Sequence, residues 1–177
     1  MSLVINIDDI PEDEEYKFDL VAKPDYFKVD PEEGILRKDV SVCGRLSKAG
    51  REVFLKGTIS TEIEQVCSRC LEPHVFPVQA ALTSHYVPAP EELETDMELH
   101  SSDTDVEFFN DNRIDMTQAV YDQMLLSLPL VQLCREDCKG ICSKCGINRN
   151  KEECGCLEED SIDPRLAVLK TLKDKLK

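Results

Sequence analysis

Residues 134–156 read Cys134-Arg-Glu-Asp-Cys138-Lys-Gly-Ile-Cys142-Ser-Lys-Cys145-Gly-Ile-Asn-Arg-Asn-Lys-Glu-Glu-Cys154-Gly-Cys156, so six of the nine cysteines fall within 23 residues. Thiols have little reason to recur every third or fourth position unless the sulfurs share a metal ion or disulfide bonds. The Cys142-Ser-Lys-Cys145-Gly146 segment favours metal, because two cysteines separated by two residues turn both sulfurs toward one tetrahedral ion. A disulfide knot or a set of scattered buried cysteines is the alternative interpretation.

A second pair, Cys67-Ser-Arg-Cys70, lies between two stretches in which apolar residues alternate with polar ones. Val53, Leu55, Gly57, Ile59 and Ile63 precede the pair with period two, and Phe76, Val78, Ala80 and Leu82 follow it. This pattern predicts two antiparallel strands with one solvent-exposed face, joined by a metal-binding turn. The alternative is a thioredoxin-like redox pair, which needs a following helix to lower the thiol pKa, whereas Pro73 and a β pattern follow here.

Tetrahedral zinc takes four ligands, so the eight clustered thiols predict up to two structural Zn²⁺ ions. The eight-residue spacer allows Cys142 and Cys145 to meet Cys154 and Cys156 as a self-contained set. Cys134 and Cys138 would then meet the remote pair Cys67 and Cys70. The competing interpretation is a single zinc ion held by four of the six C-terminal thiols. A site filled by four protein ligands has no position for a reactive water, which predicts a structural role.

The remaining pattern predicts an α+β protein in three parts. Residues 1–133 are expected to form an acidic, β-rich body, an antiparallel meander or partly open barrel, with a helix over about residues 115–128. In that helix Asp115 is the expected cap, Gln118 is expected to reach back to it, and Met116, Val120 and Met124 share one face. Residues 134–160 form the cysteine-rich zinc-binding module, and residues 161–177 form an amphipathic C-terminal helix that begins at Asp163-Pro164.

Charge is distributed unevenly along the chain, whose formal net charge is -15 with a pI near 4.6. Residues 134–177 carry ten Lys and Arg against nine Asp and Glu, which leaves 11 against 27 for residues 1–133. Such a body repels phosphate backbones and favours a basic protein partner. The expected partner or RNA patch lies on the zinc module and comprises Arg135, Lys139, Lys144, Arg149 and Lys151. Residues 88–105 hold seven acids and no Lys or Arg, which predicts a solvated insertion.

Nothing in the sequence points to a reaction. It has no Gly-x-Ser-x-Gly or His-Glu-x-x-His motif and no phosphate-binding glycine loop, and His74, His85 and His100 are isolated. The N-terminus has no basic leader, and no apolar run approaches the roughly 20 residues that span a bilayer. These features predict a reducing, cytoplasmic location, in which clustered cysteines bind metal rather than form disulfides.

Several of these motifs together resemble the bacterial YceD family, the large ribosomal RNA subunit accumulation proteins. The resemblance rests on Cys67-x-Arg-Cys70-Leu-Glu-Pro, Leu-Leu-Ser-Leu-Pro129, Cys138-Lys-Gly-Ile-Cys142-Ser-Lys-Cys145-Gly-Ile-Asn-Arg-Asn, Cys154-x-Cys156 and Asp163-Pro-Arg-Leu-Ala. Some members keep the first Cys-x-x-Cys with only two later ligands, which is consistent with pairing Cys67 and Cys70 with Cys134 and Cys138.

The resemblance implies a cytoplasmic, non-enzymatic factor needed for normal levels of large-subunit ribosomal RNA. With the charge distribution, it predicts a zinc-stabilised adaptor that binds ribosomal proteins or large-subunit precursor particles. Two alternatives come from other classes of protein. One is a thiol-disulfide redox protein that uses Cys67 and Cys70, and the other is a zinc-dependent nucleic-acid-binding regulator, which the negative charge disfavours.

Overall fold

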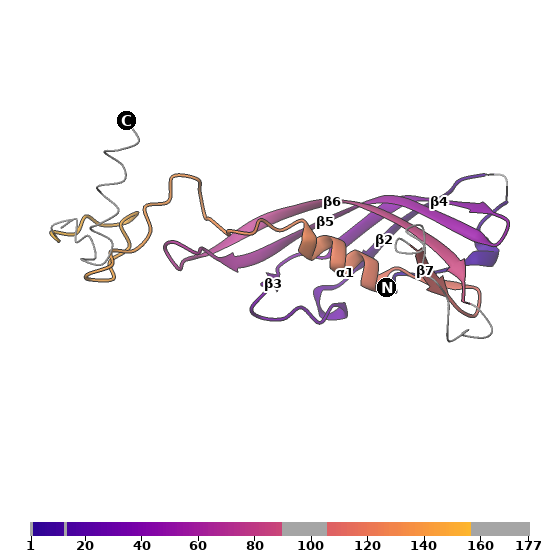
Figure 1. Cartoon of the computed structure of the whole chain (residues 1–177), viewed down its shortest axis with the longest axis horizontal. Helices are drawn as coiled ribbons and strands as arrows, with labels where there is room; N and C mark the ends of the chain where they lie inside the picture. Colours follow the sequence, from indigo (N-terminus) through magenta and orange to yellow (C-terminus); the bar gives the residue numbers. More distant parts are fainter. Residues whose placement is uncertain (1, 13, 90–105, 157–177) are drawn as a thin grey trace, which may run out of the picture.

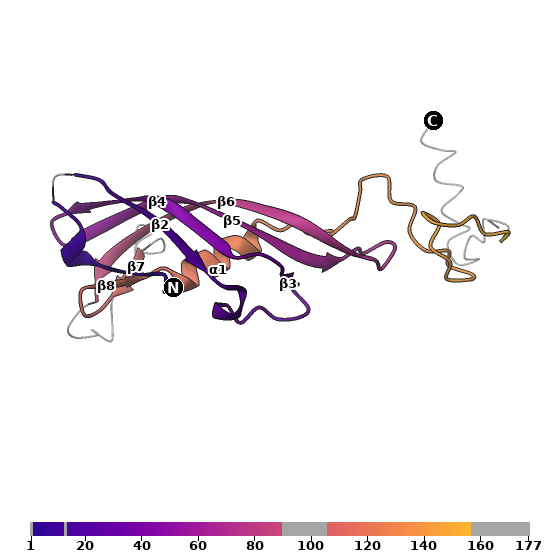
Figure 2. The same cartoon turned by 180° about the vertical axis from the view of Figure 1, so that it is seen from behind.

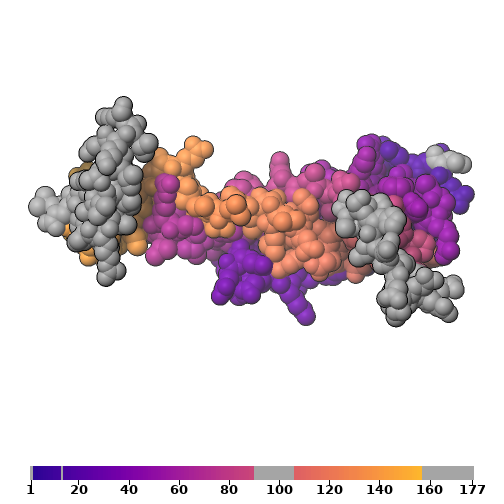
Figure 3. Space-filling view, viewed as in Figure 1, coloured from indigo at the N-terminus to yellow at the C-terminus, as the bar shows by residue number. Residues whose placement is uncertain are grey.

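The computed structural model describes residues 2–12, 14–89 and 106–156. Its main sheet has six strands. β2 (Tyr16–Ala22), β4 (Val40–Ala49), β5 (Glu52–Val66), β6 (Pro73–Pro88) and β7 (Val106–Phe109) follow one another across it, and β3 (Ile35–Leu36) also pairs with β5. β1 (Val4–Asn6) and β8 (Arg113–Asp115) form a separate two-stranded sheet, and Ile7–Asp9 and Pro24–Tyr26 are short 3-10 turns. Figures 1 and 3 show that the described part of the chain is elongated, with residues 134–156 at one end.

The β5–β6 hairpin is the longest element and carries the predicted alternation. It is paired in antiparallel register from Val53 opposite Tyr86 to Val66 opposite Pro73. The odd-numbered apolar residues of β5 and the even-numbered ones of β6 from Val78 to Leu82 are buried, whereas most intervening residues are exposed. We call the buried side of the main sheet the inner face and the opposite side the outer face. The predicted one-sided ribbon is confirmed.

The single described helix, α1 (Thr117–Leu126), covers the inner face of the curved sheet (Figures 1 and 2). Met116, Val120 and Met124 are fully buried in the same core as the sheet residues, as the i, i+4 spacing predicted. The N-cap residue is Met116 rather than the predicted Asp115, which lies one residue earlier and whose Oδ1 accepts from the Thr117 N–H at 2.9 Å. The Gln118 amide instead donates forward to Asp122 at 2.8 Å, so the predicted reach toward the cap is wrong.

Two details differ from the sequence prediction. The helix is shorter than residues 115–128, although Ser127 and Leu128 still donate backbone hydrogen bonds to its last turn. β7 runs parallel to β6, so the sheet is mostly rather than wholly antiparallel. Within the main sheet, β3 pairs with β5 at Glu64 and Ile63, beyond the β4–β5 ladder.

Two predicted segments lie outside the described residues. They are the C-terminal helix over residues 161–177 and most of the acidic stretch over residues 88–105. Across the described ranges, no helix combines the length and the apolar content needed to cross a membrane. The α+β class with a strand-rich body is confirmed.

Packing of α1 on the inner face predicts a contrast between two neighbouring positions. Met124→Ala removes a fully buried side chain and should lower the free energy of unfolding by about 2–5 kcal/mol. Leu126→Ala, at a position 78% exposed on the same helix, should change it by less than about 0.5 kcal/mol. Urea unfolding followed by circular dichroism measures both values, and equal effects would contradict the assigned helix face.

Candidate metal centre

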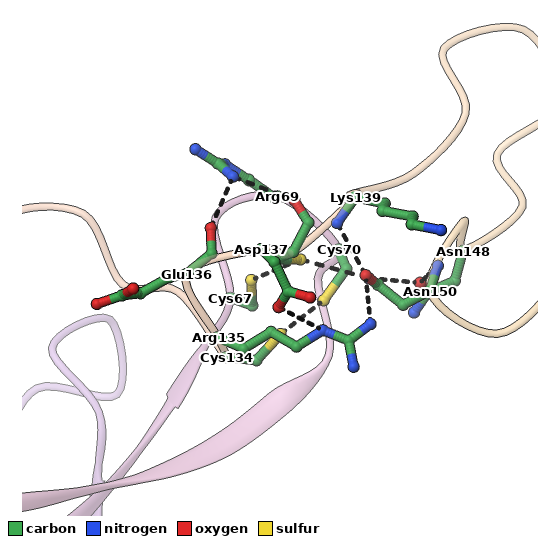
Figure 4. A network of polar contacts seen from close by, with 11 residues as sticks. Cys67, Arg69, Cys70, Cys134, Arg135, Glu136, Asp137, Lys139, Asn148 and Asn150 are labelled. Atoms are coloured by element: carbon green, nitrogen blue, oxygen red, sulfur yellow. Dashed lines mark hydrogen bonds and ion pairs between the residues drawn. The ribbon is translucent and has the colours of Figure 1, made fainter.

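Four cysteines from two distant parts of the chain converge beside the β5–β6 turn. Cys67 and Cys70 lie in the turn itself, whereas Cys134 and Cys138 lie in the segment that follows α1 (Figure 4). All four sulfurs lie within 4.8 Å of one another, with Cys67 Sγ 3.8 Å from Cys138 Sγ and Cys70 Sγ 3.7 Å from Cys134 Sγ. A tetrahedral zinc ion with Zn–S bonds of about 2.3 Å holds its sulfurs about 3.8 Å apart. This set, the bridging cluster, could therefore hold one metal ion.

The other four cysteines form a second set within the last described segment. The Sγ atoms of Cys142, Cys145, Cys154 and Cys156 also lie within 4.8 Å of one another. We call this set the terminal cluster, and it too could hold a metal ion. The structure thus brings the eight predicted ligands together in the two groups of four suggested by their spacing. The ninth cysteine, Cys43, is exposed on β4 and belongs to neither cluster.

Two of the turns that carry these cysteines share one backbone pattern. The Cys67 N–H donates to the Glu72 carbonyl and the Leu71 N–H donates to the Cys67 carbonyl, both at 2.9 Å. In the second turn, Cys142 N–H donates to the Ile147 carbonyl at 2.8 Å and Gly146 N–H to the Cys142 carbonyl at 2.9 Å. Both are tight turns rather than the start of a helix, which argues against the thioredoxin-like arrangement.

Ionisation of the bridging cluster is uneven. Burial opposes ionisation of Cys67, but the backbone N–H groups of Cys134, Cys70 and Arg69 outweigh it and lower the pKa of the Cys67 thiol to about 5. Burial and the neighbouring cysteines raise the pKa of Cys134 to about 12. Four sulfurs this close repel one another once ionised, so full deprotonation requires a compensating cation.

The thiols of the terminal cluster also differ from one another in pKa. Backbone N–H groups of Cys145 and Lys144 lower the pKa of the Cys142 thiol to about 6. The adjacent Cys145 sulfur, followed by burial, raises the pKa of Cys156 to about 12. Each cluster therefore combines a thiol that ionises readily with one that stays protonated at neutral pH. Binding of a cation would displace the proton of the second thiol.

Asn150 is the main polar residue beside the bridging cluster (Figure 4). Its Nδ2 donates to the Cys138 sulfur at 3.3 Å, and its Oδ1 accepts from the Lys139 N–H and from the Arg135 guanidinium, each at 2.8 Å. Hydrogen bonds to ligand atoms orient metal ligands and tune their basicity. Asn148 supports Asn150, since its Oδ1 accepts from the Asn150 side chain at 2.9 Å.

Glu72 connects the stretch over residues 148–151 to the β5–β6 turn. Its Oε1 accepts from Lys151 Nζ at 2.7 Å and from Asn148 Nδ2 at 3.3 Å. The Lys151 ammonium is the main cause of a lowered pKa at the Glu72 carboxyl. Sequence reasoning missed Glu72, Asn148 and Asn150 as site residues, although the Gly-Ile-Asn-Arg-Asn motif that follows Cys145 contains both asparagines.

Backbone hydrogen bonds fasten the same segment to the turn. Ser68 N–H donates to the Gln132 carbonyl at 2.8 Å, and Ile141 N–H donates to the Arg69 carbonyl at 3.0 Å. Gly140 has φ near +71°, and a Cβ there would lie 3.0 Å from that carbonyl oxygen, so glycine suits the position. The cysteine-rich segment therefore packs against the β5–β6 turn.

The predicted basic patch is partly neutralised. Lys151 is paired with Glu72, and Arg135 Nε lies 3.3 Å from Asp137 Oδ1. Lys139, Lys144 and Arg149 are exposed. Of the three histidines, His85 lies 3.0 Å from Glu52 on the hairpin, His74 lies on β6 outside both clusters, and His100 is outside the described residues.

Comparison with known proteins shows which protein family this chain matches. The family model described as "Large ribosomal RNA subunit accumulation protein YceD" matches residues 55–173. An uncharacterized protein of Mycobacterium tuberculosis is 33% identical over 125 residues, which cover 71% of this chain and 58% of that protein. The YceD protein of Haemophilus influenzae is 28% identical over 125 residues, or 70% of this chain and 67% of that protein.

A chloroplastic YCED homolog of Arabidopsis thaliana is 33% identical over 63 residues, which cover 36% of this chain and 19% of that protein. The chain spans 55–58% of the length of the mycobacterial relatives that it matches. No solved structure matches it. Because the family model covers most of the chain, including both described cysteine clusters, the chain belongs to the YceD family of large ribosomal RNA subunit accumulation proteins.

Proposed function

We propose that the protein is a cytoplasmic, non-enzymatic ribosome-biogenesis factor that supports the accumulation or processing of large-subunit ribosomal RNA. Family membership over residues 55–173 carries this proposal. The relatives from Haemophilus influenzae and Arabidopsis thaliana are named for the accumulation of large ribosomal RNA subunits. The name describes an accumulation factor, and both cysteine clusters suit a scaffold better than a reaction.

In this proposal the bridging and terminal clusters each bind one structural Zn²⁺. The donor sets support zinc, since soft thiolates in groups of four are typical of closed tetrahedral zinc sites. The ligands are Cys67, Cys70, Cys134 and Cys138 in one site and Cys142, Cys145, Cys154 and Cys156 in the other. Four thiolates leave no coordination position for a water molecule, so these residues supply rigidity rather than a nucleophile.

The proposed adaptor binds basic ribosomal proteins or large-subunit precursor particles. Residues 1–133 supply the negative charge for such partners, with 27 Asp and Glu against 11 Lys and Arg. The cysteine-rich segment contributes Arg135, Lys139, Lys144, Arg149 and Lys151 toward RNA or a neighbouring protein. All five side chains are exposed, so each of them can reach such a partner.

A redox role for Cys67 and Cys70 is the second candidate, and the lowered pKa of Cys67 favours it. The Cys67 side chain is fully buried and its sulfur lies 3.8 Å from that of Cys138, so it is poorly placed to attack a substrate disulfide. Rapid alkylation of Cys67 in the metal-loaded native protein would support the redox role.

Association with precursor particles tests the proposed function. The purified, tagged protein should retain large-subunit precursors from a ribosome-containing lysate, and sedimentation should place it with those particles rather than with small subunits. Lys139→Glu with Lys144→Glu should reduce the retained fraction, because both side chains lie on the exposed side of the cysteine-rich segment. Retention that survives nuclease indicates contact through protein, and no retention in either condition would sink the proposal.

Metal content tests the two-site assignment. Protein purified under reducing conditions should contain two zinc ions per chain by atomic emission. Cys142→Ser with Cys145→Ser should lower this to one ion, because it removes half of the terminal cluster and none of the bridging cluster. Cys43→Ser is the matched control and should keep two ions, since Cys43 lies outside both clusters. One ion in the unmodified protein would exclude the two-site assignment.

The role of Asn150 predicts a site-specific loss of metal affinity. Asn150→Ala removes the hydrogen bond to the Cys138 sulfur and the bonds to Lys139 and Arg135, and it should weaken zinc binding at the bridging cluster about 10–100-fold. Asn150→Asp should also weaken it, because a carboxylate replaces the donor beside a thiolate. Competition with a chromophoric chelator measures the affinity. Ser143→Ala, at an exposed position in the same segment, should leave it unchanged.

A further inference from the structure

Three cations form one row across the outer face of the main sheet. Lys17 of β2 lies directly opposite Arg45 of β4, and Arg45 lies directly opposite Lys56 of β5. All three side chains are exposed. Like charges at directly opposed positions of neighbouring strands destabilise a sheet. The row therefore destabilises the folded sheet locally, although acidic residues outnumber basic ones in residues 1–133.

Few anions offset this row. Arg45 Nε lies 3.4 Å from Glu15 Oε1, an exposed pair in which both side chains are about half exposed. The acids farther along the outer face of β5 have partners of their own, since Glu62 pairs with Lys38 and Glu64 with Arg37. Asp19, opposite Cys43, is the nearest acid on the next row. The row thus keeps a net positive charge.

The surface is hollowed at the same place. A shallow depression of about 370 Å³ is lined by Lys17, Arg45 and Lys56, together with Cys43 and Thr58. Gly44 and Gly57, opposite each other in β4 and β5, complete its lining. These strands approach so closely that a Cβ on Gly44 would lie 2.7 Å from the Gly57 Cα. Lys17, Arg45 and Lys56 thus line a shallow hollow with room for phosphate groups.

An aromatic pair adjoins the cationic row. Phe54 lies two residues before Lys56 on β5, and therefore on the same face, and it is 37% exposed. Its ring stacks on that of His85 in β6, with centroids 4.3 Å apart and planes at 12°. Exposed rings beside cations on an open sheet are the elements with which proteins stack the bases and neutralise the phosphates of single strands.

We propose that this outer-face site binds the phosphate backbone of single-stranded RNA. Lys17, Arg45 and Lys56 contact consecutive phosphates, and the Phe54–His85 pair stacks a base. The inference rests on the proposed role in ribosomal RNA accumulation. It assigns the RNA contact to the main sheet rather than to the cysteine-rich segment. At physiological ionic strength the screening length is about 8 Å, so acids beyond the row weaken binding without abolishing it.

Fluorescence polarisation with a labelled 12-nucleotide oligouridine tests the site on the full, metal-loaded chain. Each phosphate contact on a single strand contributes about 0.7 to the slope of log affinity against log salt, so three contacts predict a slope near -2. Lys17→Gln with Lys56→Gln should reduce its magnitude to about 0.7 and weaken binding at least tenfold at low salt. Phe54→Leu should weaken binding roughly fivefold or more at every salt concentration, because it removes a stacking surface.

Lys23→Gln with Lys28→Gln is the matched control, since it removes the same charge at exposed positions outside both the row and the lining of the depression and should leave the slope unchanged. A duplex of equal length should bind more weakly than the single strand. Displacement of the oligonucleotide by inorganic phosphate, but not by chloride of equal ionic strength, would reduce the site to one for free phosphate and overturn the proposal. So would unaltered RNA binding by the Lys17 and Lys56 variant. If that variant still associates with precursor particles, the proposed function stands without this site.

Discussion

The convergence of Cys67 and Cys70 with Cys134 and Cys138 is the constraint on which the arrangement of the molecule depends. One pair lies in the β5–β6 turn and the other follows α1, so their contact closes a loop of more than sixty residues in sequence. Thiol groups at such distances repel one another when ionised and gain little when neutral, so the arrangement suits a shared cation. Backbone hydrogen bonds from Ser68 and Ile141 reinforce the contact on both sides of the turn.

The two cysteine clusters are connected by a short polar network. Asn150 contacts the Cys138 sulfur and Asn148, and Asn148 contacts Glu72, which also binds Lys151. Asn148 and Asn150 lie between Cys145 and Cys154 in sequence, so the loop of the terminal cluster supports a ligand of the bridging cluster. The loop of the terminal cluster therefore helps to fix the position of the Cys138 sulfur in the bridging cluster.

Charged residues on the outer face form local groups that the net charge of residues 1–133 does not reveal. Acids dominate residues 1–133, yet the pairs Arg37–Glu64 and Lys38–Glu62 balance one end of the outer face. Lys17, Arg45 and Lys56 lie in one row nearer the β4–β5 turn. Net charge controls long-range attraction, whereas contact within a screening length depends on the local arrangement. A single acidic chain thus carries both acidic and locally cationic surfaces.

The sequence by itself determined the features that depend on local spacing. Period-two alternation identified β5 and β6, the i, i+4 spacing of Met116, Val120 and Met124 identified the buried face of α1, and cysteine spacing suggested the two groups of four thiols. Only the tertiary structure decided the parallel β6–β7 pairing, the contacts of Glu72 and Asn150, and the cationic row. These depend on which distant residues become neighbours, and alternation shows which face a side chain occupies but leaves its cross-strand partner open.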